Sequence, residues 1–146
     1  MRAGPFHLWF LCLAVVLAAT APLVAGAGQD VAVDSVAYAG DGAVATPRDQ
    51  TYLWRSGPHA FEVVVAAGDG SGGDYEVCVE SRPPDAARPT RLACQAATVE
   101  AGGQTAVTVP FDRWPTNLTG QQEVTAVVIP TNETGGGVAA SGTTNV

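Results

Sequence analysis

The sequence predicts an all-β protein, an antiparallel β-sandwich that follows an N-terminal signal helix. Two observations predict the fold: short runs alternate apolar and polar residues, and Gly- or Pro-rich turns separate these runs. After residue 27, no window repeats apolar residues at spacings of three and four, so no helix is expected there.

Six segments have the composition of strands, because they are rich in β-branched residues and end at turn residues. In residues 74–81, Tyr75, Val77 and Val79 share one face and glutamates occupy the other. The six predicted strands are residues 30–38, 60–66, 74–81, 90–99, 104–111 and 123–129.

Three stretches do not fit the strand pattern. Residues 41–58 lack alternation and are expected to form a loop, with a short edge strand at residues 51–54 as an option. Residues 83–89 contain three prolines, which predict an exposed connector. Residues 131–146 are rich in Thr, Asn and Gly, so we expect a flexible tail after a sandwich domain that covers residues 28–130.

The N-terminal 27 residues read as a signal peptide. Arg2 precedes an apolar run over residues 8–19, and the small residues 25–27 follow as a cleavage site. The run is short for a membrane span, which needs about 20 residues. Cleavage after Ala27 predicts a protein that is secreted or displayed at the cell surface. An uncleaved membrane anchor is the alternative.

Charge and composition narrow the possible partners. Without the signal peptide the chain keeps six arginines against 14 acidic residues, no lysine, and a net charge of about −8. This charge repels phosphate backbones and argues against a nucleic-acid partner. An acidic, lysine-free surface is typical of halophiles, although a GC-rich genome would also replace lysine by arginine.

Cys78 and Cys94 remain after removal of the signal peptide, and an even pair in an exported chain predicts one disulfide. If their strands pair, Glu80 lies opposite Leu92, and the bridge lies on the solvent side of the sheet. Redox catalysis and metal ligation are the rival roles. Against them, the chain has no Cys-x-x-Cys motif, and His59 is the only histidine after residue 27.

The sequence gives no reason to expect an enzyme, a metal ion or another cofactor. One histidine without a nucleophile motif does not form a catalytic set. The stretch Asp69-Gly70-Ser71-Gly72-Gly73-Asp74 could offer oxygens to calcium, but its spacing fits a plain turn better. Tyr52, Trp54 and Trp114, with Phe111, could stack on a sugar or small ligand, or could fill the core.

Two Asn-x-Thr sequons mark candidate N-glycosylation sites. They are Asn117-Leu118-Thr119 and Asn132-Glu133-Thr134, and neither has proline at its middle position. Both fall in predicted turn or tail segments, where an asparagine is accessible.

Several segments together resemble the CARDB-type immunoglobulin-like modules, a cell-adhesion-related family of exported archaeal and bacterial proteins. The fullest match is a strand, an Ala-Gly turn and a Thr/Val strand, like a hairpin of that family. The resembling segments are residues 30–33, 61–65, 75–79, 98–109, 125–128 and 131–133. The long residues 41–58 and the cysteine pair are not general features of the family. The resemblance implies a sandwich of about seven strands that binds or spaces, with no catalytic residues to carry over.

The function expected from these features is that of a non-enzymatic surface or adhesion module. Its partners would be surface or envelope proteins or carbohydrate, with membrane contact only if the N-terminal segment is uncleaved. The alternative is a secreted carbohydrate- or small-ligand-binding module that uses the aromatic residues named above. A third option is a secreted enzyme or inhibitor acting through residues 41–58 and 82–89.

Overall fold

The computed structural model describes residues 30–41, 43–45, 51–53, 56–132 and 137–146. The predicted signal peptide and Trp54 lie outside these ranges. Within the described ranges, no helix is long and apolar enough to span a membrane.

The described chain is built of β-strands joined by turns, as the alternation predicts. Each of the six predicted strands is present, with ends shifted by a few residues at most. The strands are β1 (Val31–Tyr38), β2 (Ala43–Ala45), β3 (Thr51–Leu53), β4 (Ser56–Ala67), β5 (Gly73–Arg82), β6 (Thr90–Val99), β7 (Gln104–Arg113), β8 (Glu123–Pro130) and β9 (Ala140–Asn145).

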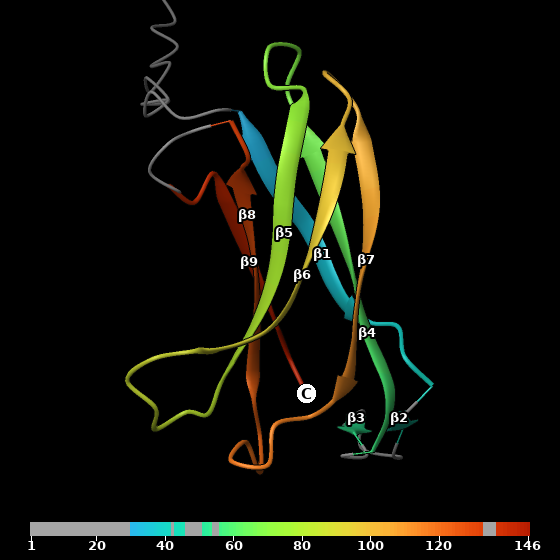
Figure 1. Cartoon of the computed structure of the whole chain (residues 1–146), viewed down its shortest axis with the longest axis vertical. Helices are drawn as coiled ribbons and strands as arrows, with labels where there is room; N and C mark the ends of the chain where they lie inside the picture. The colour runs from blue at the N-terminus through green and yellow to red at the C-terminus, as the bar shows by residue number, and fades with distance from the viewer. Residues whose placement is uncertain (1–29, 42, 46–50, 54–55, 133–136) are drawn as a thin grey trace, which may run out of the picture.

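Seven of these strands form two facing antiparallel sheets (Figure 1). One sheet has the order β1-β4-β7 and the other the order β6-β5-β8-β9. The loops gather at two ends. The upper end in Figure 1 holds the β4–β5 and β6–β7 turns, and the lower end holds the β5–β6 and β7–β8 connections. The all-β sandwich class expected from the sequence is therefore confirmed.

The core lies between the sheets and follows the period of two along each strand. On β4, Phe61, Val63 and Val65 are fully buried, whereas the intervening Glu62 is exposed. Strands β5, β7 and β8 contribute alternate residues in the same way. Full burial of one such side chain stabilises the fold by about 1.5–3 kcal/mol relative to its exposure.

Strand β1 contains a bulge that explains its uneven pattern. Val33 pairs with Val65, but the next paired residue is Ser35, so Asp34 is the extra residue. A bulge shifts the alternation by one position. Val33 and Val36, three residues apart, can therefore both pack against the core.

The segment that resembles a family hairpin connects the two sheets. Strand β6 pairs with β5 and β7 pairs with β4, so the strands on either side of the turn belong to different sheets. Gly102 in this turn has φ 68°, a conformation that glycine adopts at little cost. Figure 1 shows this connection at the upper end, beside the β4–β5 turn.

The predicted flexible tail is wrong for residues 140–145, because they form β9 at the edge of the four-stranded sheet. Beyond that strand, Gln122 and Val146 exchange two backbone hydrogen bonds, at 2.9 and 3.1 Å. Thr and Gly supply little apolar area, so composition suggests a loop. Backbone pairing with β8 nevertheless orders the segment, and the sandwich extends past residue 130.

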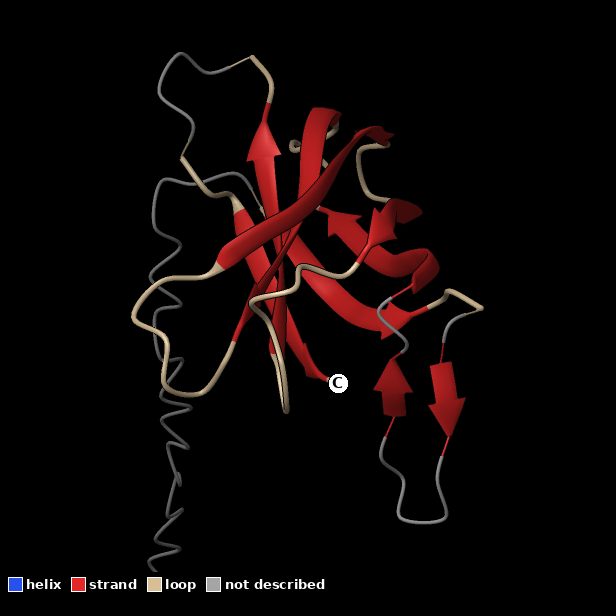
Figure 2. Ribbon diagram, turned by 60° about the horizontal axis from the view of Figure 1, so that its bottom comes forward, coloured by secondary structure: helices blue, strands red, loops and turns tan. Residues whose placement is uncertain are grey.

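Part of the loop expected at residues 41–58 is also ordered. Strands β2 and β3 pair as a two-stranded ribbon, and β3 matches the optional edge strand. Figure 2 shows the ribbon at one side of the sheets, and Leu53 of β3 packs against the core cluster. Strand β4 begins at Ser56.

A substitution at Gly142 tests whether β9 packs against β1. A Cβ at this position would lie 2.6 Å from Val33 Cγ1, and that stiff side chain has little room to move. We expect Gly142→Ala to lower the free energy of unfolding by about 1–3 kcal/mol in urea denaturation.

Gly137→Ala is the matched control, because a Cβ there meets nothing within 4 Å. Its expected effect is within about 0.5 kcal/mol. Equal stability of the two variants would mean that β9 does not pack against β1.

Candidate functional site

The candidate site lies on the outer face of the four-stranded sheet, around the cysteine pair. Cys78 on β5 and Cys94 on β6 lie directly opposite each other, with a Cα–Cα distance of 4.0 Å, and form a disulfide. The side chains of β5 that face the core belong to Tyr75, Val77 and Val79, so the bridge is on the outer face. Cys78 is nevertheless fully buried and Cys94 is half-buried.

A bulge next to the disulfide changes the expected pairing. Glu80 faces Arg91 and not Leu92, because the register shifts by one residue between Val79 and Glu80. The expectation that Leu92 lies opposite Glu80 is therefore wrong. The shift lets Leu92 pack against the core and brings a cation opposite the carboxylate.

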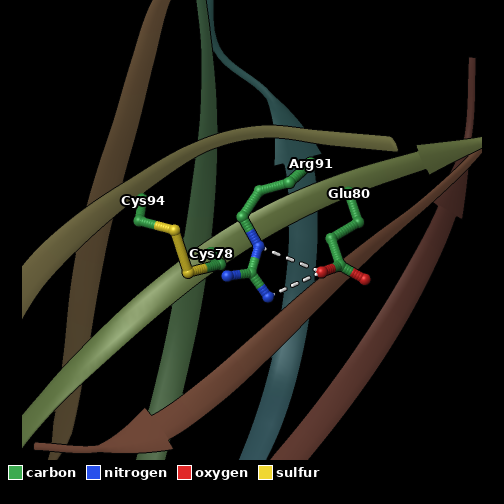
Figure 3. Close-up of polar contacts among 4 residues, drawn as sticks. All are labelled: Cys78, Glu80, Arg91 and Cys94. Atoms are coloured by element: carbon green, nitrogen blue, oxygen red, sulfur yellow. Dashed lines mark hydrogen bonds and ion pairs between the residues drawn. A yellow bond between two sulfur atoms is a disulfide. The ribbon is translucent and has the colours of Figure 1, made fainter. Parts of the chain in front are cut away.

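The new pair is an ion pair at the base of the β5–β6 connection (Figure 3). Arg91 donates from Nε and Nη2 to Glu80 Oε1, at 3.1 and 2.9 Å. Next to it, Arg82 Nη2 lies 2.5 Å from Glu123 Oε1 across β5 and β8. Each exposed pair contributes no more than about 1 kcal/mol. They join β5 to β8 and β5 to β6 beside the two ends of the connector.

The connector itself, residues 83–89, projects from the lower end of the sandwich (Figure 1). Its prolines fix φ, and Ala86 N donates to Pro83 O at 3.0 Å to close a turn. Arg88 is exposed, and no hydrogen bond or ion pair joins it to the described residues. The connector therefore presents a free guanidinium on a short loop that is braced at its base.

Charge is distributed unevenly along the sandwich. The described arginines all lie at the lower end. Arg82 is the last residue of β5 and Arg113 the last residue of β7; Arg88 lies in the connector, and Arg91 is the second residue of β6. The upper end carries exposed carboxylates without a described basic residue. These carboxylates belong to Asp30, Asp69, Asp74 and Glu100.

Trp114, a candidate ligand-stacking residue, is buried with 5% exposure and belongs to the core cluster. Its ring lies 5.7 Å from Phe111 and 6.0 Å from His59, measured between centroids. Core packing, the alternative use of this aromatic residue, is what the structure shows. The side chain of Tyr52 and all of Trp54 lie outside the described residues.

His59 completes this aromatic cluster, and its role was missed by sequence reasoning. It is 1% exposed and stacks on Phe111 at 5.0 Å. Nδ1 lies 2.8 Å from the Tyr38 hydroxyl, whereas Nε2 is buried without a hydrogen-bond partner among the described residues. Its position two residues before Phe61, on the same alternation, was the available signal. Aromatic rings and the Tyr38 hydroxyl therefore surround the His59 ring, which packs among them.

Potential metal ligands come together at one place in the described chain. Glu76, Cys78 and Cys94 offer atoms within 4.8 Å of one another. Both sulfurs are used in the disulfide, so they cannot act as thiolate ligands. The glycine-rich stretch after β4 forms a turn, in which Ser71 N donates to Gly68 O at 3.0 Å. Asp74 Oδ1 accepts instead from Thr98 Oγ1 at 2.7 Å.

The two sequon asparagines are both exposed and lie on either side of β8. Asn117 is in the β7–β8 loop, and Asn132 follows the end of β8. Glu133 and Thr134 of the second sequon lie outside the described residues.

No protein-family model and no curated protein matches the chain. Its fold is similar to parts of solved β-glucosidases. For the enzyme from Listeria innocua the identity is 14% and the TM-score 0.43, over 77% of this chain and 16% of that one. For the GH3 β-glucosidase from Bifidobacterium adolescentis the identity is 16% and the TM-score 0.44, over 81% of this chain and 17% of that one.

A third β-glucosidase, from Kluyveromyces marxianus, gives 11% identity and a TM-score of 0.40, over 80% of this chain and 14% of that one. The chain thus spans a small fraction of the length of these enzymes. Glucosidase activity is a property of the whole enzymes and is not transferred to this chain.

The disulfide can be tested by its contribution to stability. It links residues 16 apart, and the double substitution Cys78→Ala/Cys94→Ala should lower the free energy of unfolding by about 3 kcal/mol. Urea denaturation under non-reducing conditions measures this loss. A reductant should destabilise the wild type and leave the double variant unchanged; equal stability of the two chains without reductant would contradict a formed bridge.

Substitutions of Trp114 distinguish packing in the core from stacking on a ligand. Because the ring is buried, Trp114→Ala should lower the free energy of unfolding by about 3–5 kcal/mol, and Trp114→Phe should lower it less. Thermal and urea denaturation give both values. A fully stable Trp114→Ala protein would show that the ring is dispensable for packing.

Proposed function

We propose that this chain is a non-enzymatic, exported immunoglobulin-like module, similar to the CARDB type, that binds other proteins at the cell surface. The signal-like N-terminus supports export, and the seven-stranded sandwich supports a rigid scaffold with variable loops at its ends. The buried environment of His59 supports a non-catalytic role, because its neighbours are aromatic rings.

The observation that carries the proposal is the braced connector at residues 83–89. A disulfide and two ion pairs hold the strands at its base, and its prolines restrict its backbone. Little conformational entropy is then lost when the connector binds, which favours its use as a binding element. The function of the module is therefore to present this loop to a partner.

The chemistry of the connector indicates the kind of partner. Arg88 is exposed and has no described ion-pair partner, so its guanidinium is available to a carboxylate on another protein. Arginine binds carboxylates through two parallel hydrogen bonds, which lysine cannot do. Acidic proteins of the cell envelope are the proposed partners.

Pull-down from envelope extract tests this proposal. The tagged protein is compared with Arg88→Glu, and Arg113→Glu is the matched control because Arg113 is also exposed at the lower end without a described partner. Loss of a central arginine contact should reduce recovery of the same partner by about tenfold or more.

The control variant should retain the partner, since it carries the same change of net charge. Equal loss in both variants would indicate non-specific charge attraction. Unchanged recovery with Arg88→Glu would remove the connector as the binding element, and hydrolysis of a substrate by the purified wild type would contradict a non-enzymatic module.

A further inference from the structure

We propose that Asn117 carries an N-linked glycan, attached at the β7–β8 loop of the exported protein. The proposal rests on the export included in the proposed function, because a membrane-bound transferase meets only translocated chains. It does not depend on the connector or on any partner protein.

The loop presents Asn117 at the tip of a turn. Leu118 N donates to Pro115 O at 3.2 Å, which makes Asn117 the third residue of a four-residue turn. Asparagine is well suited to turns, and its side chain is exposed here. The amide that would receive the glycan therefore faces solvent.

The middle residue of the sequon is buried, whereas the residues on either side of it face solvent. Leu118 is 3% exposed and packs in the core cluster, whereas Asn117 and Thr119 on either side are exposed. The buried leucine thus leaves the two residues that define the sequon on the outside of the same loop.

Hydrogen bonds of the Gln122 side chain, which is not part of the sequon, hold the β7–β8 loop in place. Gln122 is 2% exposed, and its Nε2 donates to the backbone carbonyl of Thr119 at 3.0 Å. Gln122 Oε1 accepts from Ser81 Oγ at 3.0 Å, which ties the loop to β5. The Thr119 hydroxyl makes no hydrogen bond to the described residues, so it is free for recognition by a transferase.

The reaction joins this chain to a lipid-linked oligosaccharide. A bond forms between Asn117 Nδ2 and C1 of the first sugar, and the bond from that C1 to the lipid phosphate oxygen breaks. The phosphate leaves with the bonding electron pair, and the amide loses one proton to a base of the transferase. No oxidant or reductant is required.

Mass spectrometry of the exported chain tests the proposal. The full-length gene is expressed in a host that glycosylates an exported reference protein, and the product is cleaved after glutamate. Cleavage at Glu100, Glu123 and Glu133 places Asn117 in the fragment of residues 101–123 and Asn132 in the fragment of residues 124–133. We expect sugar mass on the fragment that contains Asn117.

Two substitutions at one position provide the control. Thr119→Ala destroys the sequon and should abolish the added mass on residues 101–123, while Thr119→Ser preserves the sequon and should retain the mass. Because Thr119 is exposed, both variants should fold and be exported. Exported wild type with an unmodified Asn117 would overturn the proposal.

The same samples separate failure of this proposal from failure of export. Absence of the chain from the exterior would overturn both the export and the glycan. Its presence outside the cell with a bare Asn117 would leave the proposed function intact and overturn the glycan alone.

Discussion

Strand β5 imposes the constraint on which the rest of the structure depends, because both of its faces and both of its edges are occupied. Its inward residues Val77 and Val79 are fully buried between the sheets. Its edges pair with β6 and β8, and its outward Cys78 is bonded to Cys94. A shift of one residue in this strand would move its apolar set to the outer face, so its register is strongly specified.

Bulges in β1 and in β6 shift the register by one residue where the local sequence departs from strict alternation. In β1 the extra residue Asp34 allows Val33 and Val36 to reach the same core. In β6 the shift brings Arg91 opposite Glu80 and lets Leu92 pack inward. Both bulges keep apolar side chains inside and charged ones outside, in places where a strict period of two would reverse them.

The connector and the disulfide near it could be predicted from the sequence, whereas the candidate ligand-binding residues predicted there were Tyr52, Trp54 and Trp114. Pro83, Pro84 and Pro89 indicate an exposed connector, and the even cysteine pair indicates a bridge at its base. The ion pairs could not be predicted in the same way. Arg91 faces Glu80 only because of a register shift, and register depends on packing across the sheet.

The local sequence by itself determined the six long strands, the turns between them and the face of β5 that enters the core. These features depend on the alternation of neighbouring residues, which is visible in one dimension. Tertiary structure decided the order of β9, the burial of Trp114 and the packing of His59. Each of these depends on strands distant in sequence. A polar segment such as β9 is ordered by the backbone groups of its neighbour, and the same aromatic residue is core or surface according to what packs over it.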